Sequence, residues 1–102
     1  GLTEGHRNVI IGRSAGDAMT TSDDCVIVGV SACGTLNHTD ANGTVAIGKA
    51  ALTNLTSGIG NTSVGYYSLS TCTDGDYNTA VGYNALKLMN GAGNIGNTAL
   101  GW

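Results

Sequence analysis

One short sequence motif of about five residues, such as NTSVG at 61–65, recurs along the chain, and each occurrence ends in glycine. We call this motif the word. The six glycines are Gly12, Gly29, Gly48, Gly65, Gly82 and Gly101. Their successive spacings are 17, 19, 17, 17 and 19 residues. A period in this range is typical of repeat architectures, in which each unit buries its apolar face against its neighbours. The repeat therefore predicts a single elongated domain of stacked units over residues 1–102.

The residues directly before each glycine predict a short strand. The position three before the glycine is β-branched and the position one before it is aliphatic, which is the period-2 alternation of a strand of about four residues. We expect the aliphatic position to face the core. Its residues are Ile11, Val28, Ile47, Val64, Val81 and Leu100. The position between is mostly small, and we expect Ala46, Ser63, Ala80 and Ala99 on the outer face, where another chain could approach closely.

Two further columns of mostly apolar residues follow each glycine, at four and seven positions after it. The expected core members are Met19, Leu36, Leu52, Leu55, Leu69, Leu86 and Met89. A spacing of four then three also occurs in helices, but glycine recurs too often here for a helix interior. One strand, one weaker apolar segment and glycine-rich corners instead predict one coil of a parallel β-solenoid, or β-roll. Successive coils would be separated by about 4.8 Å, the distance between hydrogen-bonded strands.

The repeat also divides the chain into coils. The expected boundaries are a partial coil at 1–7, full coils at 8–24, 25–43, 44–60, 61–77 and 78–96, and a partial coil at 97–102. Solenoids need polar capping units at their ends, and neither end of this sequence resembles one. We therefore expect a segment of a longer fibre, or a unit that stacks end to end.

Composition excludes several classes of partner. Only 11% of the residues are charged and the net charge is −3, whereas nucleic acid and anionic membrane surfaces require a basic patch. No apolar run approaches the roughly 20 residues that span a bilayer, so we expect no membrane insertion. The three cysteines are an odd number and do not predict a closed set of disulfides within the chain.

The repeated words resemble those of known attachment fibres. The words at 61–65 and 78–86 are similar to the "NTAVGxxAL" repeats of phage tail fibres, and the word at 44–48 resembles the "NSVAIG" head repeats of trimeric autotransporter adhesins. The 17-residue period favours the phage fibres, although Cys25 and Thr44 stand where the motif has asparagine. The resemblance implies a parallel β-roll, a homotrimer continuous with adjoining fibre segments, and a place in the virion or on an extracellular surface.

Several motifs that carry chemistry elsewhere are interpreted as structural. The stretch Gly91–Gly96 matches the dinucleotide motif GxGxxG, but a strand word follows it where that motif requires a helix. Asp23-Asp24 and Asp74-Gly75-Asp76 read as solvated turns and not as calcium sites. No pair of carboxylates at equivalent positions and no Ser-His-Asp or Cys-His arrangement indicates catalysis. We therefore expect no enzymatic activity, no metal and no cofactor.

Asparagine and cysteine occupy repeat positions that suggest structural roles. Four asparagines share one column and should hydrogen-bond the backbone at a corner: Asn8, Asn61, Asn78 and Asn97. Cys33 and Cys72 replace Leu or Met and should be buried as small apolar residues. Cys25 stands in the asparagine column, where we expect it to be more accessible, and a bridge between subunits is one alternative for it.

One column varies while the core columns do not, and it carries the candidate contact residues. It directly follows the glycine, and its members are Arg13, Val30, Lys49, Tyr66, Tyr83 and Trp102, with Tyr67 beside it. All of these except Val30 are candidates for contact with a receptor, a host glycan or protein. The aromatic rings could stack on sugars, or they could pack on one another along the fibre. The two lengthened corners, at 37–43 and 90–96, are further candidates.

Three functions remain open on these grounds. The first is a structural segment of a phage tail fibre that provides stiffness and reach and contributes to attachment to the host. The second is the stalk or head of a bacterial trimeric adhesin. The third is an ice-binding solenoid, because Thr62, Thr79 and Thr98 share a column, although valines continue that column toward the N-terminus.

Overall fold

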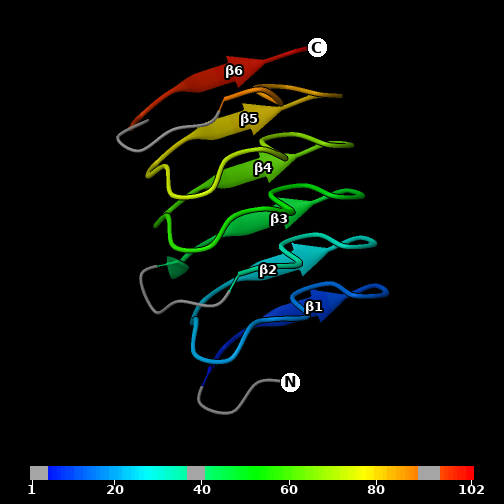
Figure 1. Ribbon diagram of the computed structural model, residues 1–102, viewed down its shortest axis with the longest axis vertical. Helices are drawn as coiled ribbons and strands as arrows, with labels where there is room; N and C mark the ends of the chain where they lie inside the picture. Colours follow the sequence, from blue (N-terminus) through cyan, green and yellow to red (C-terminus); the bar gives the residue numbers. More distant parts are fainter. Residues whose placement is uncertain (1–4, 37–40, 90–94) are drawn as a thin grey trace.

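The chain folds into a β-solenoid in which six short strands form one parallel sheet (Figure 1). The computed structural model describes residues 5–36, 41–89 and 95–102. The sheet order follows the sequence, so the described chain makes about five turns. The strands are β1 (Val9–Ile11), β2 (Val26–Val28), β3 (Val45–Ile47), β4 (Thr62–Val64), β5 (Thr79–Val81) and β6 (Thr98–Leu100).

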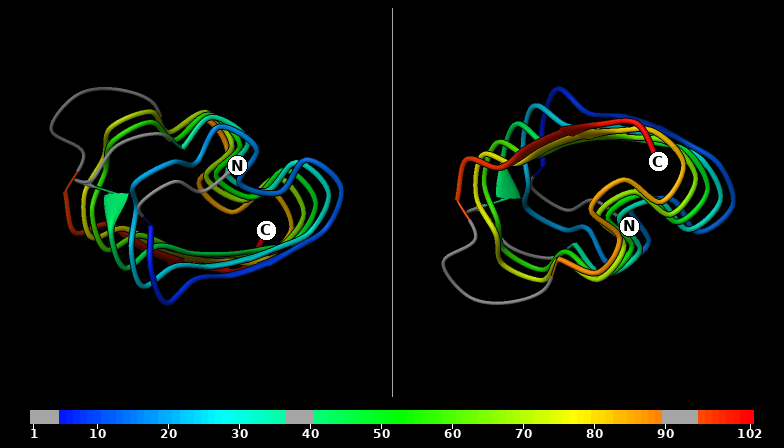
Figure 2. Two further views of the ribbon diagram at one scale, coloured as in Figure 1. Left: turned by 90° about the horizontal axis from the view of Figure 1, so that it is seen from below. Right: turned by 90° about the horizontal axis from the view of Figure 1, so that it is seen from above.

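The register of the sheet reproduces the repeat. Val9 pairs with Val26, Val26 with Val45, and Val45 with Thr62, so equivalent positions of successive words stack directly. The segments between the strands stack as well, and the coils nearly superimpose when seen along the solenoid axis (Figure 2). Backbone hydrogen bonds join them outside the sheet, as from Leu52 N to Ser68 O at 3.0 Å. The ladder of hydrogen bonds therefore runs along both walls of the coil.

In each coil, the chain between the word-ending glycine and the next strand forms what we call the return segment. Its two apolar columns, four and seven residues after the glycine, fill the interior, as the sequence predicts. Met19, Leu36, Leu52, Leu55 and Leu69 are fully buried in one cluster. Leu86 and Met89 are partly buried and pack against that cluster. The return segment therefore supplies most of the large side chains of the core.

The predicted orientation of the strands is wrong, because the middle residue of each strand points inward. Ile27, Ala46, Ser63 and Ala80 are fully buried, so the small column lines the interior and not the outer face. The aliphatic column that we expected in the core points outward: Ile11, Ile47 and Leu100 are exposed, and Val28, Val64 and Val81 are half-buried. The reason is the narrow coil, in which the Leu columns of the return segment leave room for only a small side chain opposite them in most coils.

The glycine that ends each word is required by its backbone and by its neighbour in the next coil. Gly48 has a φ of +128°, a backbone conformation that residues with a Cβ rarely adopt. A Cβ there would lie 2.6 Å from the carbonyl oxygen of Gly65. Gly12 and Gly29 repeat this arrangement, so the glycine column allows the coils to stack closely.

Candidate functional site

The outward face of the sheet presents a row of uncharged, mostly apolar side chains to the surface. The first and third residues of each strand form it: Val9, Ile11, Val26, Val28, Val45, Ile47, Thr62, Val64, Thr79, Val81, Thr98 and Leu100. Each of them is exposed or half-buried, with Ile11 60% and Leu100 85% exposed. We call this surface the sheet face. Isolated exposed apolar residues are normal, whereas a large contiguous apolar surface is a candidate for an interaction site.

The composition of the sheet face changes along the solenoid. Strands β1 to β3 present only Val and Ile, whereas β4 to β6 present one Thr and one aliphatic residue each. None of the twelve residues is charged. β-Branched side chains lose little conformational freedom when they are covered, because their χ1 angles are already restricted. The sheet face is therefore suited to association with another flat surface.

A ridge of aromatic and basic side chains borders the sheet face where the strands end. Lys49 lies over the Tyr66 ring, with Nζ 5.7 Å from the ring centroid. Tyr66 stacks on Tyr83, with the centroids 5.1 Å apart and the planes 3° from parallel. Tyr83 in turn contacts Trp102 at 6.4 Å. Successive coils thus place one continuous stack along the solenoid, held by cation–π and ring contacts.

The structure brings most of the predicted contact residues together on this ridge. Tyr67 joins the stack edge-on, 4.6 Å from Tyr66, and Lys87 Nζ lies 5.2 Å from the Tyr67 centroid. Arg13 is exposed and occupies the equivalent position in the first coil, but Val30 separates it from Lys49 in the column. Sequence reasoning missed Lys87, which lies five residues after Gly82, outside the column considered.

The stack limits how the ridge could bind a sugar. Because Tyr66 and Tyr83 are nearly parallel and face each other, each has one face covered by the other. Trp102 is 91% exposed and keeps most of its indole accessible. The ridge therefore offers tyrosine hydroxyls, two ammonium groups and one indole, and not a row of free ring faces.

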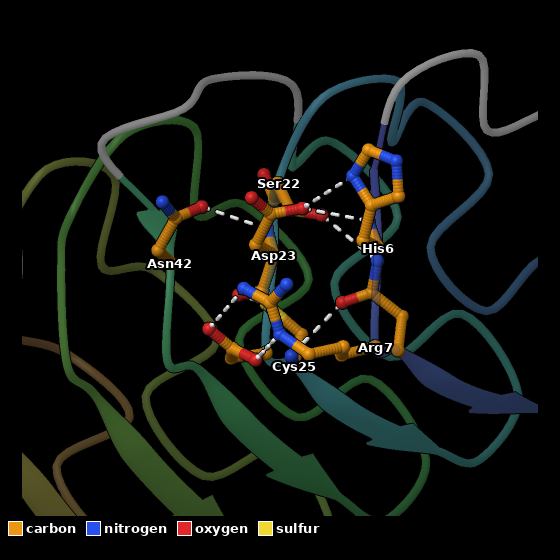
Figure 3. Close-up of polar contacts among 8 residues, drawn as sticks. His6, Arg7, Ser22, Asp23, Cys25 and Asn42 are labelled. Carbon is orange, nitrogen blue, oxygen red and sulfur yellow. Dashed lines mark hydrogen bonds and ion pairs between the residues drawn. The ribbon is translucent and has the colours of Figure 1, made fainter.

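A polar network borders the sheet face on the other side, where the chain enters the strands (Figure 3). Arg7 donates to both carboxylate oxygens of Asp24, at 2.6 and 3.0 Å. This hydrogen bond, with the charge of the guanidinium, lowers the pKa of Asp24 and raises that of Arg7. Asp23 accepts the His6 backbone N–H at 2.6 Å, and the Asp23 N–H donates to Asn42 Oδ1 at 2.7 Å. Three successive coils are linked in this way.

The asparagine column forms a hydrogen-bonded ladder, as predicted. Asn61 Oδ1 accepts from the backbone N–H and the Nδ2 of Asn78, at 3.0 and 3.2 Å. Asn78 Oδ1 accepts from Asn97 in the same way, at 3.0 Å for both. Asn61 and Asn78 are fully buried. Buried polar groups need such partners, so these residues serve the architecture.

The prediction that Cys25 is accessible is wrong. Cys25, Cys33 and Cys72 are all free thiols and all buried, and desolvation raises the pKa of each. Cys25 Sγ lies 3.3 Å from the carbonyl oxygen of Asp23 and 3.6 Å from that of Ala41, so the thiol points into the coil. A buried thiol cannot bridge to another chain, so that alternative does not fit the structure.

The predicted turns carry no evident ion or cofactor site in the part that is described. Asp76 Oδ1 accepts the Ile59 N–H at 2.9 Å, which gives that carboxylate a structural role. Residues 37–40 and 90–94, which hold most of the two lengthened corners and of the GxGxxG stretch, lie outside the described residues. Over 5–36, 41–89 and 95–102, three or more His, Cys, Asp or Glu side chains never gather as metal ligands would, and the surface has no pocket.

Within the same ranges, no helix has the length and apolar character needed to span a bilayer. Comparisons with protein-family models, with curated proteins and with solved structures gave no significant match.

Proposed function

We propose that the chain is a structural, non-enzymatic segment of an attachment fibre of the phage tail-fibre type, in which three identical chains associate through the sheet face. The observation that carries this proposal is the sheet face itself, twelve uncharged residues in register over six strands. Left in water, this surface would favour association, because covering apolar area is favourable by about 25 cal/mol per Å². A second copy presents the same flat surface.

The fold fits a mechanical role. Each coil is bonded to the next both through the sheet and through the return segments, and the described shape is long relative to its thickness, with extents of 34 × 26 × 17 Å. Stretching such a fibre would require breaking several backbone hydrogen bonds per coil at once. Association of three such coils would add stiffness and would cover the apolar side of each.

The assembly state tests the proposal directly. Native mass spectrometry and sedimentation equilibrium of the purified segment, between about 1 and 100 µM, should show a species of three chains. Circular dichroism should confirm that the protein is folded in the same samples. A folded monomer across this range would overturn the proposal.

Attachment to a host surface would involve the ridge, because its exposed groups differ from coil to coil. Trp102, Tyr83 and Lys49 offer an indole, a hydroxyl and an ammonium group, which suit a glycan that carries an anionic substituent. Binding to a glycan array should fall at least tenfold for Trp102→Ala. Tyr77→Ala is the matched control, since Tyr77 is an exposed aromatic at the other border of the sheet face. Equal binding by wild type and Trp102→Ala would remove the ridge from this role.

Ice binding is a second candidate, favoured by the C-terminal half of the sheet face. Thr62, Thr79 and Thr98 point outward in register beside Val64, Val81 and Leu100, which is a flat array of methyl and hydroxyl groups. Only three coils carry it, and Val9, Val26 and Val45 continue the column without hydroxyls. Thermal hysteresis that is lost in Thr79→Lys would support this function, and its absence in the wild-type protein would exclude it.

A further inference from the structure

The charged residues are divided between the two borders of the sheet face. Within five residues after the word-ending glycines there are three cations and one anion: Arg13, Lys49, Lys87 and Asp17. Within five residues before the strands, the sequence has six anions and one cation, of which Asp23, Asp24, Asp74, Asp76 and Arg7 lie in the described part. In the described residues the border where strands end is thus basic, and the border where strands begin is acidic.

This division distinguishes between the ways in which two copies can cover their sheet faces. If the two fibre axes are parallel, facing strands run in opposite directions, and the basic border of one copy lies beside the acidic border of the other. If the axes are antiparallel, facing strands run in the same direction and like borders meet. Around a threefold axis that runs along the solenoids, the chain axes are parallel. The strand ends of each chain then meet the strand starts of the next chain.

We propose that copies of this chain associate with their fibre axes parallel, and that the basic border of one chain meets the acidic border of its neighbour. This inference rests on the association through the sheet face proposed above. Arg13, Lys49, Asp24 and Asp74 are all exposed, so they are available at the rim of the covered area. Rim charges act mainly on orientation and specificity, because water still screens them.

The polar network supports a rigid acidic border. Arg7 holds Asp24 through two hydrogen bonds, and Asp23 and Asp76 each accept a backbone N–H from an adjacent coil. On the basic border, Lys49 and Lys87 are held over aromatic rings. Charges that are already held in place lose less conformational entropy when they pair across an interface.

Charge reversal tests the arrangement. Arg13→Glu with Lys49→Glu makes both borders acidic and should weaken association about tenfold or more in sedimentation experiments at low salt. Adding Glu4→Lys, Asp24→Lys, Asp40→Lys and Asp74→Lys in the same chain leaves five cations and two anions before the strands, which exchanges the charges of the two borders. This variant should restore association to within about threefold of wild type. Raising the salt to 1 M should remove most of the difference, because exposed charges are then screened beyond about 3 Å.

Mixing wild type with the exchanged variant, one of them isotopically labelled, gives the decisive result by native mass spectrometry. Parallel association predicts that each sorts with its own kind, because equal charges meet in a mixed assembly. An excess of mixed species would show antiparallel axes and overturn the inference, and so would a statistical mixture, which would show that the borders do not matter.

The controls separate this inference from the proposed function. Arg13→Gln with Lys49→Gln removes the charges without reversing them and should give an intermediate effect, even if the reversed variant fails to fold. A monomeric wild type would refute the association and the inference together. A wild-type trimer with no response to charge reversal would refute the inference alone.

Discussion

At the scale of single residues, the structure depends on positions where only one kind of side chain fits. Gly48 has both an unusual φ and a carbonyl oxygen 2.6 Å from its missing Cβ, whereas Gly43 has φ +72° with no atom within 4 Å of that position. Gly48 therefore combines a more strained backbone with crowding by the next coil, whereas Gly43 has only a left-handed backbone.

Gly48→Ala should destabilise the protein by about 3 kcal/mol or more, because the alanine pays for a strained φ and also collides with Gly65. Gly43→Ala should cost only about 1 kcal/mol, the usual penalty of a left-handed residue. Urea unfolding of both variants measures the difference. Equal losses would show that the coils are not packed as closely at the glycine column as the structure indicates.

The buried thiols give the stability a dependence on alkaline pH. Desolvation raises the pKa of Cys33 well above its ordinary value of 9.0. As the pH passes that value, the thiol ionises in the unfolded chain but stays protonated in the folded one. The free energy of unfolding should therefore be unaffected below about pH 8 and should fall above pH 9, by about 1.4 kcal/mol per pH unit for this thiol. Cys33→Ala should reduce that slope between pH 9 and 10, and an unchanged slope would contradict the prediction.

At the scale of the coil, the sizes of two facing core residues are complementary. One stands in the middle of the strand, and the other stands four residues after the glycine. Coils that carry Ile in the middle of the strand, Ile10 and Ile27, have a small residue four positions after the glycine, Gly16 and Cys33. Coils with Ala or Ser in the strand have Leu there instead, as with Ala46 and Leu52. The position of a Cβ on Gly16 lies 3.4 Å from the Ile10 side chain, so the two positions meet inside the coil.

This complementarity predicts a coupled pair of substitutions in the third coil. Leu52→Cys should leave a cavity and cost about 2–3 kcal/mol, and Ala46→Ile should overpack the same space at about 1–3 kcal/mol. The double variant reproduces the pairing of the second coil, so its loss should be at least 1 kcal/mol smaller than the sum of the two single losses. A thermodynamic cycle from chemical unfolding tests this, and strict additivity would refute the complementarity.

Within one coil, the sequence predicts the strand register and the buried columns of the return segment correctly, but it predicts the orientation of the strand wrongly. The glycine spacing predicts the parallel register, and the columns that hold Met19 and Leu69 are buried as expected. The two faces of each strand are assigned the wrong way round, because alternation fixes only that neighbours point to opposite sides. Val64 is aliphatic and Ser63 is polar, yet Ser63 is inside, where it bonds to Ser68. The volume of the interior decides between the faces, and that volume depends on the return segment.

The candidate site was predictable only in part for the same reason. The ridge could be found because a column whose chemistry varies, as from Lys49 to Tyr83, is not constrained by the core. The sheet face could not, because its residues have the composition of a core and were assigned to one. The polar network was hidden as well, since Arg7 and Asp24 become neighbours only when residues 17 apart are stacked.

At the scale of the whole molecule, the aliphatic residues of the strands point outward, so their apolar character indicates an exposed surface and not the core. A solenoid that hides its aliphatic residues inside is complete by itself. In this solenoid, Ile and Val side chains also lie on the outside of the strands. Because the return segment fills most of the interior, these outward Ile and Val residues are free to serve association without weakening the fold. The fold and the proposed assembly would therefore depend on neighbouring residues of the same strand.

Two adjacent substitutions in β2 should separate these roles. Val28→Lys puts a charge on the sheet face, where the side chain is half-buried and points outward, so the monomer should lose no more than about 1 kcal/mol while the assembly dissociates. Ile27→Lys puts the same charge into the core, where Ile27 is fully buried, and should prevent folding, because an unpaired charge is not tolerated in an apolar interior. Circular dichroism and sedimentation of both variants make the measurement. A folded Val28→Lys that assembles like wild type would show that the sheet face is not the interface, whereas a folded Ile27→Lys would show that the strands are turned the other way.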